Sequence, residues 1–280
     1  PSAGMKRLFK MMLPRTASLA VSQINLLIIL SLASSLTVGS VAIFNLATNI
    51  QSLPFGLIGV SLAVAAFPVL SQAVNAKRED TFIRVLFQQL RWIWFLLVPV
   101  TVYLLLLAPD IIYAVLGTGK FDPTQVTRLA SILRILAIAI PAQSAVALLV
   151  RAFYAKHDTW RPFAISIVAE IVNLILCLSL RRTLGLEGLA IAFTISTMVN
   201  GAGLWLLLPD RKKIAASERL SLHVGTIRIV LAAVVMGLCG WFIERVWPLT
   251  SWSLVGLIKH AIPLILIPGV IYLASAYVFG

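Results

Sequence analysis

Long apolar runs separated by short polar segments dominate this sequence. A helix that crosses a bilayer needs about 20 consecutive apolar residues, and eight stretches reach or approach that length. We therefore predict an all-α, polytopic membrane protein with about eight transmembrane helices in a single transmembrane domain over residues 1–280. The predicted spans cover residues 13–36, 39–73, 92–108, 126–150, 162–180, 188–208, 224–242 and 254–279.

The second stretch is too long for one straight crossing. It runs over 35 residues, from 39 to 73, which as a helix measures about 50 Å against a hydrocarbon core of about 30 Å. Pro54, Gly56 and Gly59 lie in its middle, and proline removes a backbone donor there. The pattern favours one tilted, bent helix, with these three residues as hinge candidates.

The basic residues gather in every second connection, which indicates an orientation. Short cytoplasmic loops carry an excess of Lys and Arg. That rule places both the N-terminus and the C-terminus in the cytoplasm. The basic residues assigned to the inside are Lys6, Arg7, Lys10, Arg15, Lys77, Arg78, Arg84, Arg91, Arg151, Lys156, Arg161, Arg211, Lys212, Lys213, Arg219 and Arg228.

Composition supports the membrane interpretation and excludes several functions. The chain is 60% hydrophobic and 12% charged, whereas a soluble domain is about 25% charged. A net charge of +13 is here a property of loops, so we expect no nucleic-acid partner. Cys177 and Cys239 lie in apolar runs without a metal-binding spacing. With no recognisable enzyme motif, we expect no enzyme, no metal and no cofactor.

Ionisable residues inside a span are functional candidates. Glu170 lies midway along the fifth span with Asn173 one turn further on the same face. The pair is either a cation, proton or substrate site, or a structural hydrogen bond between helices. Arg134, in the fourth span, could pair with Glu170, contact an anionic substrate or extend toward the interface.

Side-chain amides mark the first two spans. They either line a polar cavity or connect neighbouring helices through hydrogen bonds. Gln143 and Asn200 stand alone in later spans and are interpreted as packing contacts. The candidate cavity amides are Gln23, Asn25, Asn45 and Asn49, with Gln51 nearby.

Several strings resemble the bacterial lipid II flippases of the MurJ or MviN family, within the MOP exporter superfamily. Residues 21–25 (Val-Ser-Gln-Ile-Asn) resemble the opening of that family's seventh helix. Residues 53–60 and 67–71, each with a proline, resemble its eighth helix. Residues 116–122 are similar to a glycine-basic-Phe loop signature, and residues 152–159 followed by Pro162 resemble the junction of helices ten and eleven.

The resemblance implies a MOP-type C-terminal lobe, helices seven to fourteen of a longer protein; the opening residue, Pro1, likewise suggests a fragment or processed product. It implies that the lobe lies in a bacterial cytoplasmic (inner) membrane and helps to flip undecaprenyl-linked peptidoglycan precursor by alternating access, for cell-wall biogenesis. The implied partners are this precursor, membrane lipids and an N-terminal lobe, in the same chain or a separate one.

One departure from the family concerns the substrate. The family often has an Asp-Arg pair before the Pro-x-Gly of the eighth helix, where this sequence has Thr48 and Asn49. The basic residue expected to face the diphosphate from this lobe is therefore absent at that position. Two alternatives stay open: another MOP exporter, for polysaccharide-linked lipids or cation-coupled drug export, and a non-transporting membrane scaffold.

Overall fold

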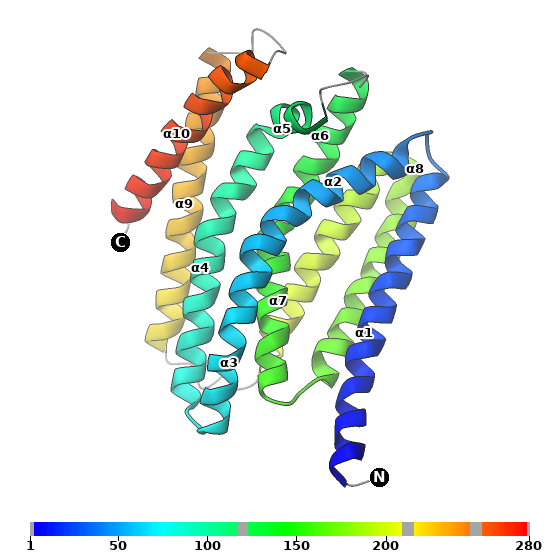
Figure 1. The fold of residues 1–280 in the computed structure, drawn as a ribbon, viewed down its shortest axis with the longest axis vertical. Helices are drawn as coiled ribbons and strands as arrows, with labels where there is room; N and C mark the ends of the chain where they lie inside the picture. Colours follow the sequence, from blue (N-terminus) through cyan, green and yellow to red (C-terminus); the bar gives the residue numbers. More distant parts are fainter. Residues whose placement is uncertain (1–2, 117–122, 209–215, 247–253, 279–280) are drawn as a thin grey trace.

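The computed structural model describes residues 3–116, 123–208, 216–246 and 254–278, and within these ranges the chain is helical with short turns and no strand. Long rods lie side by side and alternate in direction along the chain (Figure 1). The elements are α1 (Ala3–Ser34), α2 (Ser40–Pro54), the π-helix η1 (Phe55–Val60), α3 (Ser61–Asn75), α4 (Glu79–Leu106), α5 (Ala108–Leu116), α6 (Pro123–Ile138), α7 (Ile140–Ala155), α8 (Trp160–Leu206), α9 (Ala216–Val246) and α10 (Leu254–Val278).

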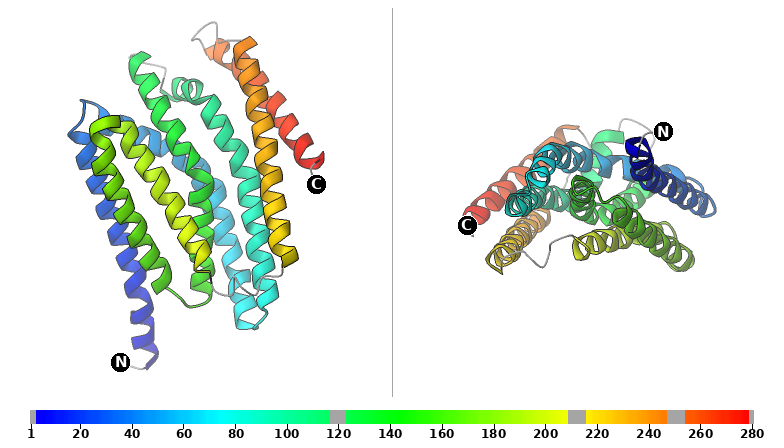
Figure 2. Two further views of the ribbon diagram at one scale, coloured as in Figure 1. Left: turned by 180° about the vertical axis from the view of Figure 1, so that it is seen from behind. Right: turned by 90° about the horizontal axis from the view of Figure 1, so that it is seen from below.

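The apolar lengths agree with a multi-pass membrane protein. Among the described residues, five helices are long and apolar enough to cross a bilayer, or six when α6 and α7, bent by 40°, count as one span. The 47-residue α8 is one of the five, although it reverses direction at Gly185, whose φ is 58°. Figure 2 shows its two halves returning alongside each other. The number of eight crossings stays a prediction.

Local sequence explains where the rods end. The hydroxyls of Ser34 and Ser35 donate to the carbonyls of Ser31 and Leu32, at the end of α1. Hydroxyls that bond to the preceding turn compete with the next helical hydrogen bond. The chain then turns at Gly39, whose φ of 87° favours glycine.

The second predicted span bends by a change of helix type. The α-helical geometry of α2 ends at Pro54, and the next six residues form η1 before α3 resumes the α-helix. The continuous apolar segment Ser40–Asn75 is 36 residues long and is visibly curved in Figure 1. Proline starts the irregularity because it lacks the N–H that would bond one turn back.

Two other prolines have no N–H to offer the backbone carbonyl one turn earlier. In each case a hydroxyl from a neighbouring helix donates to that carbonyl instead. Pro141 cannot bond the carbonyl of Ala137, and the hydroxyl of Thr101 in α4 donates to it instead, at 3.4 Å. Pro99 cannot bond the carbonyl of Phe95, and the hydroxyl of Tyr272 in α10 donates to it at 2.8 Å. Within a bilayer, where no water can replace a lost bond, such substitution makes proline tolerable.

The helices form one large core and a smaller cluster. The large core joins α1 to α8 through buried aliphatic and aromatic side chains such as Leu86, Leu133 and Phe153. The smaller cluster, built on Ala232, Met236 and Tyr272, packs α9 and α10 against α4. The pair α9–α10 therefore lies at one edge of the molecule (Figure 2).

Candidate functional site

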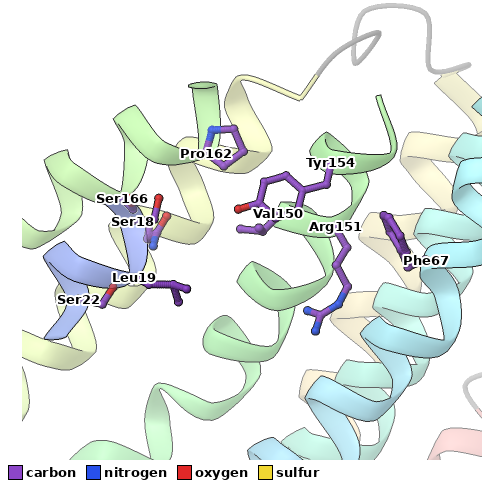
Figure 3. Close-up of a pocket in the computed structure, with 10 residues that line it drawn as sticks. Ser18, Leu19, Ser22, Phe67, Val150, Arg151, Tyr154, Pro162 and Ser166 are labelled. Atoms are coloured by element: carbon purple, nitrogen blue, oxygen red, sulfur yellow. The ribbon is translucent and has the colours of Figure 1, made fainter. Parts of the chain in front are cut away.

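A cavity of about 360 Å³, lined by both polar and apolar side chains, opens between four helices at the end of the molecule where the N-terminus lies. Helices α1 and α8 form one wall, and α3 and α7 form the other (Figure 3). Turns between α3 and α4 and between α7 and α8 lie at this same end, and they carry basic residues such as Lys77 and Lys156. The lining residues are Ser18, Leu19, Ser22, Phe67, Val150, Arg151, Tyr154, Pro162, Ser166 and Asn200.

Arg151 and Tyr154 give the α7 wall its chemistry. The guanidinium of Arg151 donates to the carbonyl of Ala147 at 2.7 Å, which anchors the side chain along its own helix. The Tyr154 ring extends from α7 toward the side on which Ser18 and Ser166 lie (Figure 3). A guanidinium, a phenol and several hydroxyls together suit a ligand that combines an anionic group with sugar or amide groups.

Asn200 adds an acceptor on the far wall. Its Oδ1 atom is buried and has no hydrogen-bond partner in the described structure. A buried acceptor without a partner costs about 1–3 kcal/mol, which a ligand hydroxyl or N–H in the cavity would recover. The sequence predicts a packing role for Asn200, whereas the structure places it at the cavity.

Glu170 and Asn25 meet one helical turn further into the bundle. On α1, Asn25 follows Ser22 by three residues, and on α8, Glu170 follows Ser166 by four. The Asn25 amide donates to the Glu170 carboxylate, joining the two helices. Ser22 and Ser166 line the cavity, so the Asn25–Glu170 contact lies about one helical turn from its lining on both helices.

Asn173 extends this polar group along α8. It is 1% exposed, interacts with the Glu170 carboxylate and accepts a hydrogen bond from Cys177 Sγ at 3.2 Å. Three of the predicted site residues, Glu170, Asn173 and Asn25, are thus in one place.

The other predicted site residues lie elsewhere. The Arg134 guanidinium donates to the carbonyl of Leu105 at 2.8 Å, so it binds α4 backbone and is not paired with Glu170. Gln23, Asn45 and Asn49 are exposed on α1 and α2. Among the other amides, Gln51 is buried and donates to Gln143 Oε1 at 2.7 Å, tying α2 to α7.

The hinge candidates differ in their surroundings. Gly56 has open space where a side chain would begin, whereas Gly59 is packed against Ser144 of α7. A Cβ atom on Gly59 would overlap the Ser144 hydroxyl and lie 2.7 Å from its Cβ. Ser144 is fully buried, and its hydroxyl has no partner in the described structure. The close contact of η1 with α7 therefore depends on glycine.

The described residues contain no cluster that could bind a metal ion. Within the described ranges, no group of three or more His, Cys, Asp or Glu side chains is placed to hold a metal ion.

Comparison with known proteins gives the family. A family profile described as "Lipid II flippase MurJ" matches residues 2–262. The "Probable lipid II flippase MurJ" of Bdellovibrio bacteriovorus is 30% identical over 276 residues, which are 98% of this chain and 52% of that protein. The protein of the same name from Rhizobium tropici is 28% identical over 279 residues, 99% of this chain and 52% of that protein.

Solved structures share the fold. The inward closed conformation of a lipid II flippase MurJ matches with a TM-score of 0.77 at 23% identity, covering 95% of this chain and 53% of that one. An outward-facing multidrug resistance MATE transporter of the MOP superfamily matches with a TM-score of 0.65 at 14% identity, covering 97% and 62%. The chain spans about half the length of the curated relatives it matches. On the match of the family profile to most of its length, the chain belongs to the lipid II flippase MurJ family.

Proposed function

We propose that this chain is the C-terminal lobe of a flippase that moves undecaprenyl-linked peptidoglycan precursor across the bacterial cytoplasmic membrane by alternating access. It would act as a transporter, without enzymatic chemistry, and would complete its path together with an N-terminal lobe. Both termini would face the cytoplasm. The observation that supports this proposal best is a cavity with an arginine and several hydrogen-bonding groups in a chain of this family.

The cavity fits the chemistry of such a precursor. A diphosphate and sugars cannot enter hydrocarbon without partners, because burying unpaired charge is prohibitive. Arg151 supplies a positive charge that pairs with phosphate, and Tyr154, Ser18, Ser166 and Asn200 supply hydrogen-bonding groups. Arg151 would thus take the part that the resemblance assigns to a basic residue at the position of Asn49.

Glu170 is proposed as the coupling residue. Its carboxylate lies one turn beyond the cavity and joins α1 to α8 through Asn25. Binding a proton or a cation there would change the charge held between these two helices, and a change of charge at a helix contact shifts their relative position. The same carboxylate favours a second candidate function, cation-coupled export of another substrate.

Complementation tests the proposal. The resident lipid II flippase of a test bacterium is depleted, and this chain is expressed alone and together with a cognate first lobe. We expect growth to be rescued only when this chain is expressed together with the first lobe. If neither the chain alone nor the chain with the first lobe rescues growth at normal expression, and drug efflux depends on Glu170, cation-coupled export of another substrate would be favoured.

The cavity assignment is tested by Arg151→Gln against Arg161→Gln. Arg161 belongs to the same end of the molecule but is 55% exposed and pairs with Asp158. We expect rescue to be lost with Arg151→Gln and kept with Arg161→Gln at equal expression. Equal rescue by both variants would remove Arg151 from the substrate path.

A further inference from the structure

A second cavity, of about 250 Å³, lies at the opposite end of the molecule from the first. It is bordered by the turn between α1 and α2, the first turns of α6 and the reversal of α8 at Gly185. Its volume is several times the roughly 30 Å³ that one water molecule occupies in the liquid. The lining residues are Leu36, Thr37, Ser40, Ile43, Arg128, Ile132, Gly185, Leu186 and Glu187.

Two opposite charges line this cavity without contacting each other. The Arg128 guanidinium donates to the Thr37 hydroxyl at 3.4 Å, and Glu187 accepts a hydrogen bond from the Ser131 hydroxyl at 3.1 Å. No ion pair joins Arg128 to Glu187 among the residues that the structure describes. Each charge is therefore held on its own wall by a neutral hydroxyl.

The lining of this cavity combines apolar side chains with charged groups that a ligand can reach. Aliphatic side chains of Leu36, Ile43 and Ile132 form much of the lining, and Ser40 is 3% exposed, its hydroxyl 3.0 Å from that of Thr37. Arg128 and Thr37 are exposed and Glu187 is half-buried, so a ligand that enters the cavity can reach both charged groups and form charge-assisted hydrogen bonds with them. A ligand with one cationic and one anionic group would satisfy both walls at once.

We infer that this cavity binds a zwitterion that carries an ammonium and a phosphate or carboxylate group. The ammonium pairs with Glu187, and the anionic group pairs with Arg128 and the hydroxyls of Thr37 and Ser40. A phosphoethanolamine lipid headgroup and a soluble zwitterion of the same chemistry are the two sources. This site is separate from the proposed flipping cavity, and its assignment does not depend on that function.

The test measures lipid retention by native mass spectrometry. The purified protein is equilibrated with mixed micelles of phosphatidylethanolamine, which is zwitterionic, or phosphatidylglycerol, which is only anionic. We expect the protein to retain phosphatidylethanolamine in preference to phosphatidylglycerol. Arg128→Gln and Glu187→Gln should each lower this retention roughly tenfold, because each removes one charge-assisted hydrogen bond to the headgroup. Arg182→Gln and Glu244→Gln are the matched controls, since neither residue lines the cavity.

The outcomes separate the sources from a purely structural role. Competition by soluble O-phosphoethanolamine, with no lipid retained, would assign the site to a soluble zwitterion. Equal retention of both lipids, unchanged by either variant and without that competition, would overturn the inference. A second result would also overturn it. If both single variants lose thermal stability, and the charge exchange Arg128→Glu with Glu187→Arg restores stability without any zwitterion binding, the two charges serve only to join the helices.

Discussion

At the scale of single residues, the contact between Asn25 and Glu170 allows charge and hydrogen bonding to be separated. In Glu170→Gln, an amide oxygen can still accept the Asn25 hydrogen bond, but the negative charge is lost. We predict that this variant folds with a melting temperature close to that of the wild type and fails to rescue flippase depletion at equal expression.

Cys177→Ala is the matched control on the same helix face. Cys177 is 1% exposed and bonds only to Asn173 in the described structure, so its loss costs about 1 kcal/mol of stability and leaves rescue intact. Full rescue by Glu170→Gln would show that the carboxylate is a structural contact.

The sequence indicated part of this site. A carboxylate in an apolar run is conspicuous, so Glu170 and Asn173 can be identified without a structure. Its partner Asn25 lies 145 residues away, and which of several amides meets it depends on helix packing. Charge patterning assigns Arg151 to a cytoplasmic segment, because a basic residue at a span end usually marks the interface. Its cavity exists only once α1, α3, α7 and α8 are assembled.

At the scale of elements, the packing of η1 on α7 gives a prediction about Gly59. Gly59→Ala places a Cβ 2.7 Å from that of Ser144, and overpacking of this kind costs about 1–3 kcal/mol. We expect a lowered melting temperature in detergent, largely restored by Ser144→Gly, which removes the opposing Cβ. Ser144→Ala keeps that Cβ and should restore less. Equal restoration by both would mean that the hydroxyl alone causes the clash.

The prolines give a second prediction at this scale. Tyr272→Phe leaves the Phe95 carbonyl without a donor, because Pro99 has no N–H to offer. The expected cost in free energy of unfolding is about 1–3 kcal/mol. Tyr103→Phe should cost less, since its acceptor, the Ile265 carbonyl, lies one helical turn before the N–H of Gly269.

A double-mutant cycle checks the origin of the effect. Pro99→Ala returns an N–H to the Phe95 carbonyl, so Tyr272→Phe should cost less in that background. Denaturation in detergent measures all four proteins, and an unchanged cost would show that the tyrosine acts through ring packing instead.

The elements differ in how far sequence could predict them. Apolar length and Pro54 indicate a bent second span, and the structure has a change of helix type at that residue. The close approach of α7 at Gly59 within this segment is a tertiary contact, which no local pattern records. The reversal of α8 at Gly185 separates stretches predicted as two spans, because a φ of 58° is readily adopted by glycine.

At the scale of the whole molecule, orientation across the membrane is the remaining prediction. The turn between α1 and α2 lies at one end of the bundle and the turn between α3 and α4 at the other (Figure 1). The positive-inside rule places the second turn, which carries Lys77 and Arg78, in the cytoplasm.

Val38 and Ala76 are exposed in the two turns, so each can carry a reporter cysteine after Cys177 and Cys239 are replaced by Ala. In intact cells, a membrane-impermeant maleimide should label Val38→Cys and spare Ala76→Cys until the membrane is permeabilised. The reverse pattern would mean that the molecule has the opposite orientation, with both termini outside. The arginine-containing cavity would then open on the outer side of the membrane, whereas the precursor to be flipped starts on the cytoplasmic side.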